Sequence, residues 1–314
     1  MSNFTLLVIF NIAVVVLLVF DLFIFHRKAH TITVKEALWS ASFWIFLALA
    51  FAVGVYFLRG HDAAMKFLAG YVIEESLSVD NLFVFLVIFP YFKVSKQLQH
   101  RVLFWGIVGA LVMRAAFIAA GVAIIHYFEW VMYLFGAFLI FTGFKLVTGK
   151  EEKEVDPQKN PIVKAFKKIM PVTNDYAGES FFTVRNGRLW ATPLMVVLIV
   201  VETTDIIFAI DSIPAVLSIT TDPFIVYTSN IFAILGLRSI FFALSGLMDI
   251  FHYLHYGLGI ILAFVGLKML ISGFYEIPTG AALAVIGLVL LISIIVSIIK
   301  APPSSLEGEK KIKI

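Results

Sequence analysis

The sequence predicts an all-α, polytopic membrane protein with about nine transmembrane helices. First, 61% of its 314 residues are hydrophobic, whereas soluble proteins contain only about 45 to 50% apolar residues. Second, the mean hydropathy is +0.98. Third, the apolar residues are gathered in stretches of about 20, the length that a helix needs to cross about 30 Å of hydrocarbon.

Nine such stretches follow one another along the chain. They lie at about 4–25, 37–58, 67–90, 102–125, 130–148, 192–217, 223–247, 254–274 and 280–299. The predicted parts are two N-terminal helices (1–66), a first group of three spans (67–148), a polar loop (149–191), a second group of three spans (192–274), a final span (275–300) and a disordered tail (301–314). The first stretch lacks a basic leading segment and a small-residue cleavage site, so we interpret it as a retained span.

Lysine and arginine are distributed unevenly between the two sides of the predicted membrane. Of the 24 basic residues, 18 fall on one side, only Arg59 and Lys66 fall on the other, and four lie within spans. Because basic loops remain in the cytoplasm, this asymmetry predicts an N-terminus outside the cell. It also predicts a cytoplasmic C-terminus and a cytoplasmic 149–191 loop.

The composition excludes several classes of protein. There is no cysteine, so the chain has no disulfide, thiolate metal site or cysteine redox centre of its own. The formal charge of +3 is too small to indicate a nucleic-acid partner. All seven histidines lie at span ends or in loops, so we expect no histidine-based zinc site in the middle of the membrane. No prosthetic group is indicated.

Acidic residues occur in two places where a helix embedded in hydrocarbon should carry none. Residues 201–215 read V-E-T-T-D-I-I-F-A-I-D-S-I-P-A, and residues 73–85 read I-E-E-S-L-S-V-D-N-L-F-V-F. Each carboxylate at mid-bilayer depth costs about 2.5 to 3.5 kcal/mol on insertion scales, so the acids need a compensating partner. A bound cation is the simplest one. Aligning Asp80-Asn81 with Asp211-Ser212 places Glu74 opposite Asp205.

The basic residues within spans extend this similarity into a repeat. Arg114 and Arg238 each lie one span after an acidic stretch, and Lys145 and Lys268 each end a glycine-containing span with both glycines in register. Spans three to five therefore match spans six to eight, and three intervening spans give the copies opposite orientations. Transporters with such inverted repeats bind ions near the midplane at the repeat interface. The alternative, chance similarity among apolar helices, is disfavoured because charged residues and glycines match in order.

The oxygen-rich side chains in these spans favour a hard divalent cation such as manganese, magnesium or calcium. Six residues along an unbroken helix turn about 600°, which leaves Glu74 and Asp80 about 120° and 9 Å apart. We therefore expect either that Asp80 and Asp211 converge from opposite repeats, or that the helix unwinds near Pro214. The alternative is internal ion pairing, in which Glu75 or Glu202 neutralises Arg114 or Arg238. Lys145 and Lys268 can extend from span ends toward the interface, and the glycines beside them suit close helix packing.

The 149–191 loop contains two further patterns. Ile162, Val163, Phe166, Ile169 and Met170 fit one face of a short interfacial helix. The stretch F-F-T-V-R-N-G-R-L-W at 181–190 predicts two short strands joined by an Asn-Gly turn.

The acidic motifs, the T-D-P-F-I-V-Y-T-S-N-I-F-A-I-L-G-L-R stretch and the glycine-lysine spans resemble the TerC family of bacterial membrane proteins, and most of all its Alx branch. The resemblance extends from about residue 10 to 300. It implies manganese(II) efflux across the bacterial inner membrane. It also implies that the motif residues are metal ligands. These are Glu75, Asp80, Asn81, Glu202, Asp205, Asp211 and Ser212, with Glu74 as an alternative to Glu75.

We therefore expect an exporter of divalent metal ions that works by alternating access, with manganese favoured and magnesium or calcium left open. One alternative, from the family's older labels, is a non-transporting protein that changes redox state or tellurite resistance through partners. Another is intramembrane proteolysis by Asp80 and Asp211, which we disfavour because no protease motif is present; we expect no enzyme. The sequence leaves the oligomeric state open, a homo-oligomer included.

Overall fold

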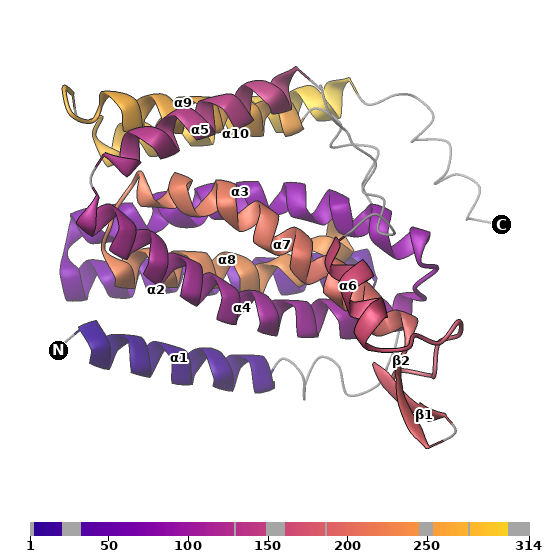
Figure 1. Cartoon of the computed structure of the whole chain (residues 1–314). Coiled ribbons are helices and arrows are strands. Elements are labelled where there is room, and N and C mark those ends of the chain that lie inside the picture. Colours follow the sequence, from indigo (N-terminus) through magenta and orange to yellow (C-terminus); the bar gives the residue numbers. More distant parts are fainter. Residues whose placement is uncertain are drawn as a thin grey trace.

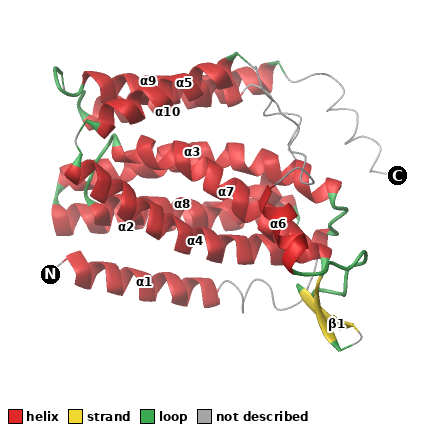
Figure 2. Cartoon of the chain, viewed as in Figure 1, coloured by secondary structure: helices red, strands yellow, loops and turns green. Residues whose placement is uncertain are grey.

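The computed structural model describes residues 3–20, 33–128, 130–148, 161–185, 187–244, 254–275 and 277–300. The side chains of a few residues inside helices, Asp80 among them, also lie outside this description. Nearly all of the described chain is helical, and the only strands in it form one hairpin (Figure 2). The prediction of an all-α protein is confirmed for this part of the chain. The predicted disordered tail lies outside the described residues.

A long helix overlaps each of the nine predicted ranges. These helices are α1 (Asn3–Phe20), α2 (Val34–Arg59), α3 (His61–Tyr91), α4 (Lys96–Tyr127), α5 (Val131–Val147), α7 (Pro193–Leu217), α8 (Pro223–Leu244), α9 (Leu254–Ile271) and α10 (Thr279–Ile299). Helices α2, α3 and α4 extend beyond their predicted ranges at both ends. Between α5 and α7 lie the short helix α6 (Pro161–Ile169) and the hairpin of β1 (Phe182–Arg185) and β2 (Arg188–Ala191).

Five of the described helices, α2, α4, α7, α8 and α10, are long and apolar enough to cross a membrane. α1, α5 and α9 contain shorter apolar segments. α3 is 31 residues long and carries Glu74, Glu75 and Asp80 inside its apolar stretch. The structure thus supports a polytopic membrane protein, while the number of nine spans stays a prediction. Helices suit this environment because they satisfy all backbone hydrogen bonds within one segment.

The long helices run along one common direction (Figure 1). α5, α9 and α10 form a layer on one side of the bundle, and α1 lies at the opposite edge. Between them, α3 packs on α8 and α7, while α4 packs on α7 and α8. α6 and the hairpin lie at the end of the bundle where α7 begins. The four helices α3, α4, α7 and α8 therefore surround the centre of the molecule.

α5 and α9 pack against each other through glycines. A Cβ atom on Gly136 would lie 2.8 Å from the carbonyl oxygen of Gly266, and a Cβ on Gly259 would lie 2.7 Å from that of Gly143. Gly136 near the start of α5 meets Gly266 near the end of α9, and Gly143 near the end of α5 meets Gly259 near the start of α9. The two helices are therefore antiparallel. Glycine is required at these positions because the two backbones approach so closely.

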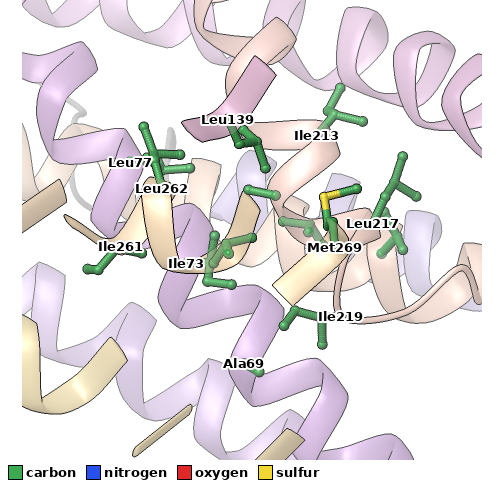
Figure 3. Close-up of a cluster of buried hydrophobic side chains, with 14 of the residues drawn as sticks. Ala69, Ile73, Leu77, Leu139, Ile213, Leu217, Ile219, Ile261, Leu262 and Met269 are labelled. Carbon is green, nitrogen blue, oxygen red and sulfur yellow. The ribbon is translucent and has the colours of Figure 1, made fainter. Parts of the chain in front are cut away.

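The largest apolar cluster joins α3, α5, α7 and α9 (Figure 3). Ile73 and Leu139 are fully buried in it, and Leu217 and Met269 are almost so. Figure 3 shows side chains from both groups of helices interdigitating in this cluster. It connects the layer of α5 and α9 to the central helices, so the two layers share one core.

The predicted Asn-Gly hairpin is confirmed by the antiparallel pairing of β1 and β2. Its base is tied to the preceding loop, because Ala191 N–H donates to the Pro171 carbonyl at 3.0 Å and the Thr192 hydroxyl donates to the Ser180 carbonyl at 2.7 Å. The Tyr176 hydroxyl donates to the Phe92 carbonyl at 2.7 Å. Burial raises the pKa of Tyr176, which keeps this donor protonated. The 171–192 segment is thus held against the end of the bundle.

Candidate functional site: a buried carboxylate and arginine cluster

The guanidinium of Arg114 lies at the centre of the bundle, where only 1% of the residue is exposed. Its Nη1 atom donates to the Glu74 carboxylate, to Ser212 Oγ at 3.0 Å and to Asn230 Oδ1 at 3.3 Å. Its Nη2 atom donates to Asp205 Oδ1 at 3.3 Å. We call these five residues the Arg114 cluster. They come from α3, α4, α7 and α8, so the cluster joins all four central helices.

The two acids of the Arg114 cluster are the pair that the sequence alignment places opposite each other. Glu74 and Asp205 each precede the last acid of their motif by six residues. On unbroken helices this spacing turns the last acid about 120° away. The structure therefore brings Glu74 and Asp205 together on one guanidinium. Asp80 lies in α3, but its side chain lies outside the described part of the structure. The predicted convergence of Asp80 with Asp211 therefore stays a prediction.

Asp211 lies outside the Arg114 cluster and faces α5. The Thr142 hydroxyl donates to Asp211 Oδ1 at 3.4 Å, and Lys145 of α5 interacts with the same carboxylate electrostatically. The alternative expectation, an unwound helix near Pro214, is wrong for α7, which runs as one helix from Pro193 to Leu217. Pro214 lies in its last turn, where few hydrogen bonds depend on it.

Two further acids extend the Arg114 cluster. Glu75 lies against Gly236 of α8 and interacts electrostatically with its neighbour Glu74. Glu202 lies one turn before Asp205 on α7, and the two carboxylates interact. The Glu202 carboxylate fills the space that a side chain on Gly109 of α4 would occupy. Four acids, Glu75, Glu74, Asp205 and Glu202, therefore follow one another beside the guanidinium of Arg114, each interacting electrostatically with the next.

Most of the buried polar atoms that lack a hydrogen-bond partner around this row are acceptors. Among the described residues they include Glu74 Oε2, both oxygens of Glu75, Asn81 Oδ1 and Asp205 Oδ2, against the donors Arg114 Nε and Asn230 Nδ2. Ser78 Oγ also lacks a partner. Glu74, Ser78 and Asn81 are spaced i, i+4 and i+7 and therefore share one face of α3. Buried acceptors without a donor are costly, and they favour a proton or a cation as the missing partner.

No three histidine, cysteine, aspartate or glutamate side chains gather closely enough to hold a metal ion within the described part of the chain. Glu74 and Asp205 are instead held apart by the guanidinium that lies between them. Four oxygen-bearing side chains already converge on this cation. Oxygen atoms of this kind are also the ligands that hard divalent cations prefer.

Comparison with known families decides what kind of protein carries this cluster. Residues 59–304 match the model of the integral membrane protein TerC family. The chain belongs to the TerC family. It is similar to an uncharacterized membrane protein of Myxococcus xanthus, with 49% identity over 95% of this chain and 94% of the relative. It is also 45% identical to a putative membrane-bound redox modulator Alx of Salmonella typhi, over 92% of each chain. No solved structure matches it.

These relatives place this TerC protein in the Alx-like branch, as the motifs predict, and identify it as an integral membrane protein. The 201–215 motif, which contains Asp205 and Ser212, thus belongs to a membrane-embedded helix of a TerC protein. The predicted alternative, pairing of Arg114 with Glu75 or Glu202, differs from the structure: Arg114 pairs with Glu74 and Asp205. Of the two neighbouring acids Glu74 and Glu75, Glu74 is the one whose carboxylate binds the guanidinium.

The other predicted charge-pairing residues of this TerC chain lie away from the Arg114 cluster. Arg238 Nη1 lies 3.4 Å from His100 Nε2 of α4. Lys268 was expected to reach toward the membrane interface. Its Nζ atom donates to the Ser218 carbonyl at the end of α7, at 2.8 Å. Such a lysine neutralises the partial negative charge at a helix C-terminus.

Three residues at the site were not predicted as site residues. Asn230 belongs to the T-S-N stretch of α8, and an amide inside an apolar span was the signal that could have identified it. Thr142 and Gly109 carry no such signal, since threonine and glycine are common in membrane helices. Their roles follow only from the packing of α5 and α4 on α7.

Proposed function

We propose that this TerC protein exports a divalent metal ion, most favourably manganese(II), through the carboxylates of α3 and α7. The observation that carries the proposal is the excess of acids: Arg114 pairs with Glu74 and Asp205, and these two acids have Glu75 and Glu202 as further acidic neighbours. Buried charges of one sign need counterions. A transported hard cation supplies them, and oxygen ligands favour manganese, magnesium or calcium over copper or zinc.

In this proposal Arg114 occupies the position that the metal ion takes during transport. The guanidinium already bridges one acid from α3 and one from α7, and the second oxygen of each acid has no donor. When a divalent ion enters, Glu74 and Asp205 exchange one charged partner for another, while Ser212 and Asn230 contribute neutral oxygens. The exchange avoids a stage at which both carboxylates are buried without any counterion, which would be costly.

Alternating access in this proposal arises from two inverted repeats, α3 to α5 and α7 to α9. Three features support it. Sequence-equivalent acids meet at Arg114, α3 packs on α8 as α4 packs on α7, and the glycines of α5 pair reciprocally with those of α9. Outward transport of a 2+ ion against an inside-negative potential costs about 4.6 kcal/mol per 100 mV. We therefore propose coupling to inward proton flow, in a bacterial inner membrane with the N-terminus outside and the C-terminus in the cytoplasm.

Manganese uptake into inside-out membrane vesicles tests the proposed function. Glu75→Gln and Asp205→Asn are expected to reduce uptake about tenfold or more, equivalent to about 1.4 kcal/mol or more of lost stabilisation. The matched control is Asp62→Asn, because Asp62 lies on α3 but is exposed and pairs only locally with Lys66. This control should keep full uptake, and each variant is first shown to be folded by size-exclusion chromatography.

Unchanged manganese uptake in Asp205→Asn would contradict the proposal. Tellurite and magnesium are measured in the same vesicles, because the Salmonella relative is named as a redox modulator. A chain without cysteine has no thiol for redox chemistry of its own. A redox or tellurite phenotype that survives loss of metal uptake would favour the alternative, in which the protein acts through partners.

A further inference from the structure

The hairpin of β1 and β2 has one apolar face that is open. Val184 pairs with Leu189 across the strands, and Phe182 pairs with Ala191. Side chains two residues apart on a strand point to the same side, so these four residues share a face. Val184 is 68% exposed, Leu189 50% and Phe182 41%. An apolar face of this kind on an otherwise anchored hairpin indicates an interaction surface.

Helix α6 presents a second apolar edge beside the hairpin. Ile162 and Ile169 are seven residues apart, which places them on the same side of the helix, and they are 47% and 86% exposed. Val163 is buried in the cluster that contains Leu194 and Val197 of α7. α6 is therefore fixed on α7 while its isoleucine edge is left uncovered.

Basic residues lie on both elements, on the sides opposite the exposed apolar residues. Lys164, Lys167 and Lys168 lie on α6, and Arg185 and Arg188 flank the hairpin turn. The acids of the described 161–192 segment are Asp175 and Glu179, and Glu179 already pairs with Arg101 at 3.0 Å. An apolar face opposite a side that carries lysine and arginine is typical of segments that lie in the headgroup region of a membrane and attract anionic lipids.

The position of the hairpin relative to α7 sets its depth. β2 ends at Ala191, and the apolar helix α7 begins at Pro193. Leu189 is two residues from Ala191, or about 7 Å along the strand. The headgroup region on each side of the hydrocarbon is about 5 to 7 Å thick. Because Thr192, the residue after β2, is the N-cap of α7, the base of the hairpin lies at this level.

We propose that Ile162, Ile169, Phe182, Val184 and Leu189 form an interfacial surface that lies in the headgroup region of the bilayer entered by α7. The lysines and arginines of α6 and the hairpin bind the phosphates of anionic phospholipids there. The partner is the lipid of the host membrane, and the inference does not depend on the proposed transport function.

Single-cysteine labelling tests the interfacial surface, because the chain contains no cysteine of its own. The full chain is reconstituted into nanodiscs that contain phosphatidylglycerol, and a fluorophore is attached to Val184→Cys or to Thr183→Cys. Thr183 is the matched control because the adjacent strand residue points to the opposite face. A nitroxide near the lipid headgroup is expected to quench the probe at position 184 about three times as strongly as the probe at position 183, since an interfacial segment buries its apolar face in this region.

The role of lipid charge is tested with the double variant Lys167→Gln and Lys168→Gln. It should lower quenching at position 184 in phosphatidylglycerol nanodiscs and leave quenching unchanged in phosphatidylcholine nanodiscs. Both lysines are exposed, so the variant is expected to fold. Equal quenching at positions 183 and 184 would overturn the proposal. So would shielding of position 184 that occurs only in native membranes, because a protein partner would then cover the surface.

Discussion

Replacement of Arg114 by methionine is expected to lower the free energy of unfolding by about 3–5 kcal/mol, because Glu74 and Asp205 would be left buried without their counterion. The side chain also donates to Ser212 and Asn230, and these contacts would be lost as well. Thermal unfolding of the purified protein in detergent measures the effect. Arg101→Met is the matched control, since Arg101 forms an exposed pair with Glu179 and lies 5.6 Å from the centre of the Phe181 ring, and exposed contacts of these kinds contribute about 0 to 1 kcal/mol each.

Two additions to this experiment separate a structural role of Arg114 from the proposed exchange with metal. Glu74→Gln combined with Arg114→Met should recover part of the stability, because one unpaired charge is removed. Added manganese(II) should raise the melting temperature of Arg114→Met more than that of the unchanged protein, because ligand binding stabilises only the folded state. If manganese stabilises both proteins equally, Arg114 does not occupy the metal position.

Gly143→Ala is expected to separate α5 from α9 and to lower the free energy of unfolding by about 1–3 kcal/mol, the range typical of overpacking. A Cβ atom at this position would overlap the carbonyl oxygen of Gly259 and lie 2.8 Å from Ala263 N. Both are backbone atoms, so no side-chain rotation can relieve the overlap. Thermal unfolding and manganese uptake are measured together, because α5 also carries Thr142, the donor to Asp211.

Gly54→Ala is the control for this substitution. Gly54 lies in α2, and a Cβ atom there would meet nothing within 4 Å. Alanine is the better helix former by up to about 1 kcal/mol, so this variant should be as stable as the unchanged protein or slightly more so. Equal melting temperatures for Gly143→Ala and Gly54→Ala would show that the close approach of α5 and α9 is not required.

The local pattern of the amino-acid sequence was sufficient to predict where the helices and the hairpin form. Apolar stretches longer than the bilayer thickness fix where helices form, and the Asn-Gly pair at 186–187 fixed the turn between β1 and β2. The start of α2 is local in the same way, since Thr33 and Glu36 form a capping box. Such signals depend on residues within a few positions of one another.

The composition of the Arg114 cluster was predicted only in part. The alignment of the two motifs made Glu74 and Asp205 equivalent in sequence, but it did not predict that they meet, and the arginine that joins them is 40 residues from Glu74 and 91 residues from Asp205. No local pattern encodes such distances. The 120° rotation between Asp205 and Asp211 follows from helix geometry, yet only the packing of α5 on α7 shows that Asp211 meets Thr142.

Metal transport gives a functional reason for the many acids in the membrane helices α3 and α7. Glu75 makes no hydrogen bond in the described structure, although both of its oxygens are buried. A residue of this kind lowers stability, so it is expected to serve function. Gly109 of α4 leaves room for Glu202 of α7, and Gly236 of α8 leaves room for Glu75 of α3.

The most direct test of the central claim is the location of manganese in the protein itself. Crystals grown with manganese(II) and measured by anomalous scattering should show a peak between α3 and α7, bound by oxygens of Asp205 and of Glu74 or Glu75, with the guanidinium of Arg114 displaced. A manganese-transporting protein whose peak lies away from these carboxylates, with Arg114 still bound to Glu74 and Asp205, would contradict the account.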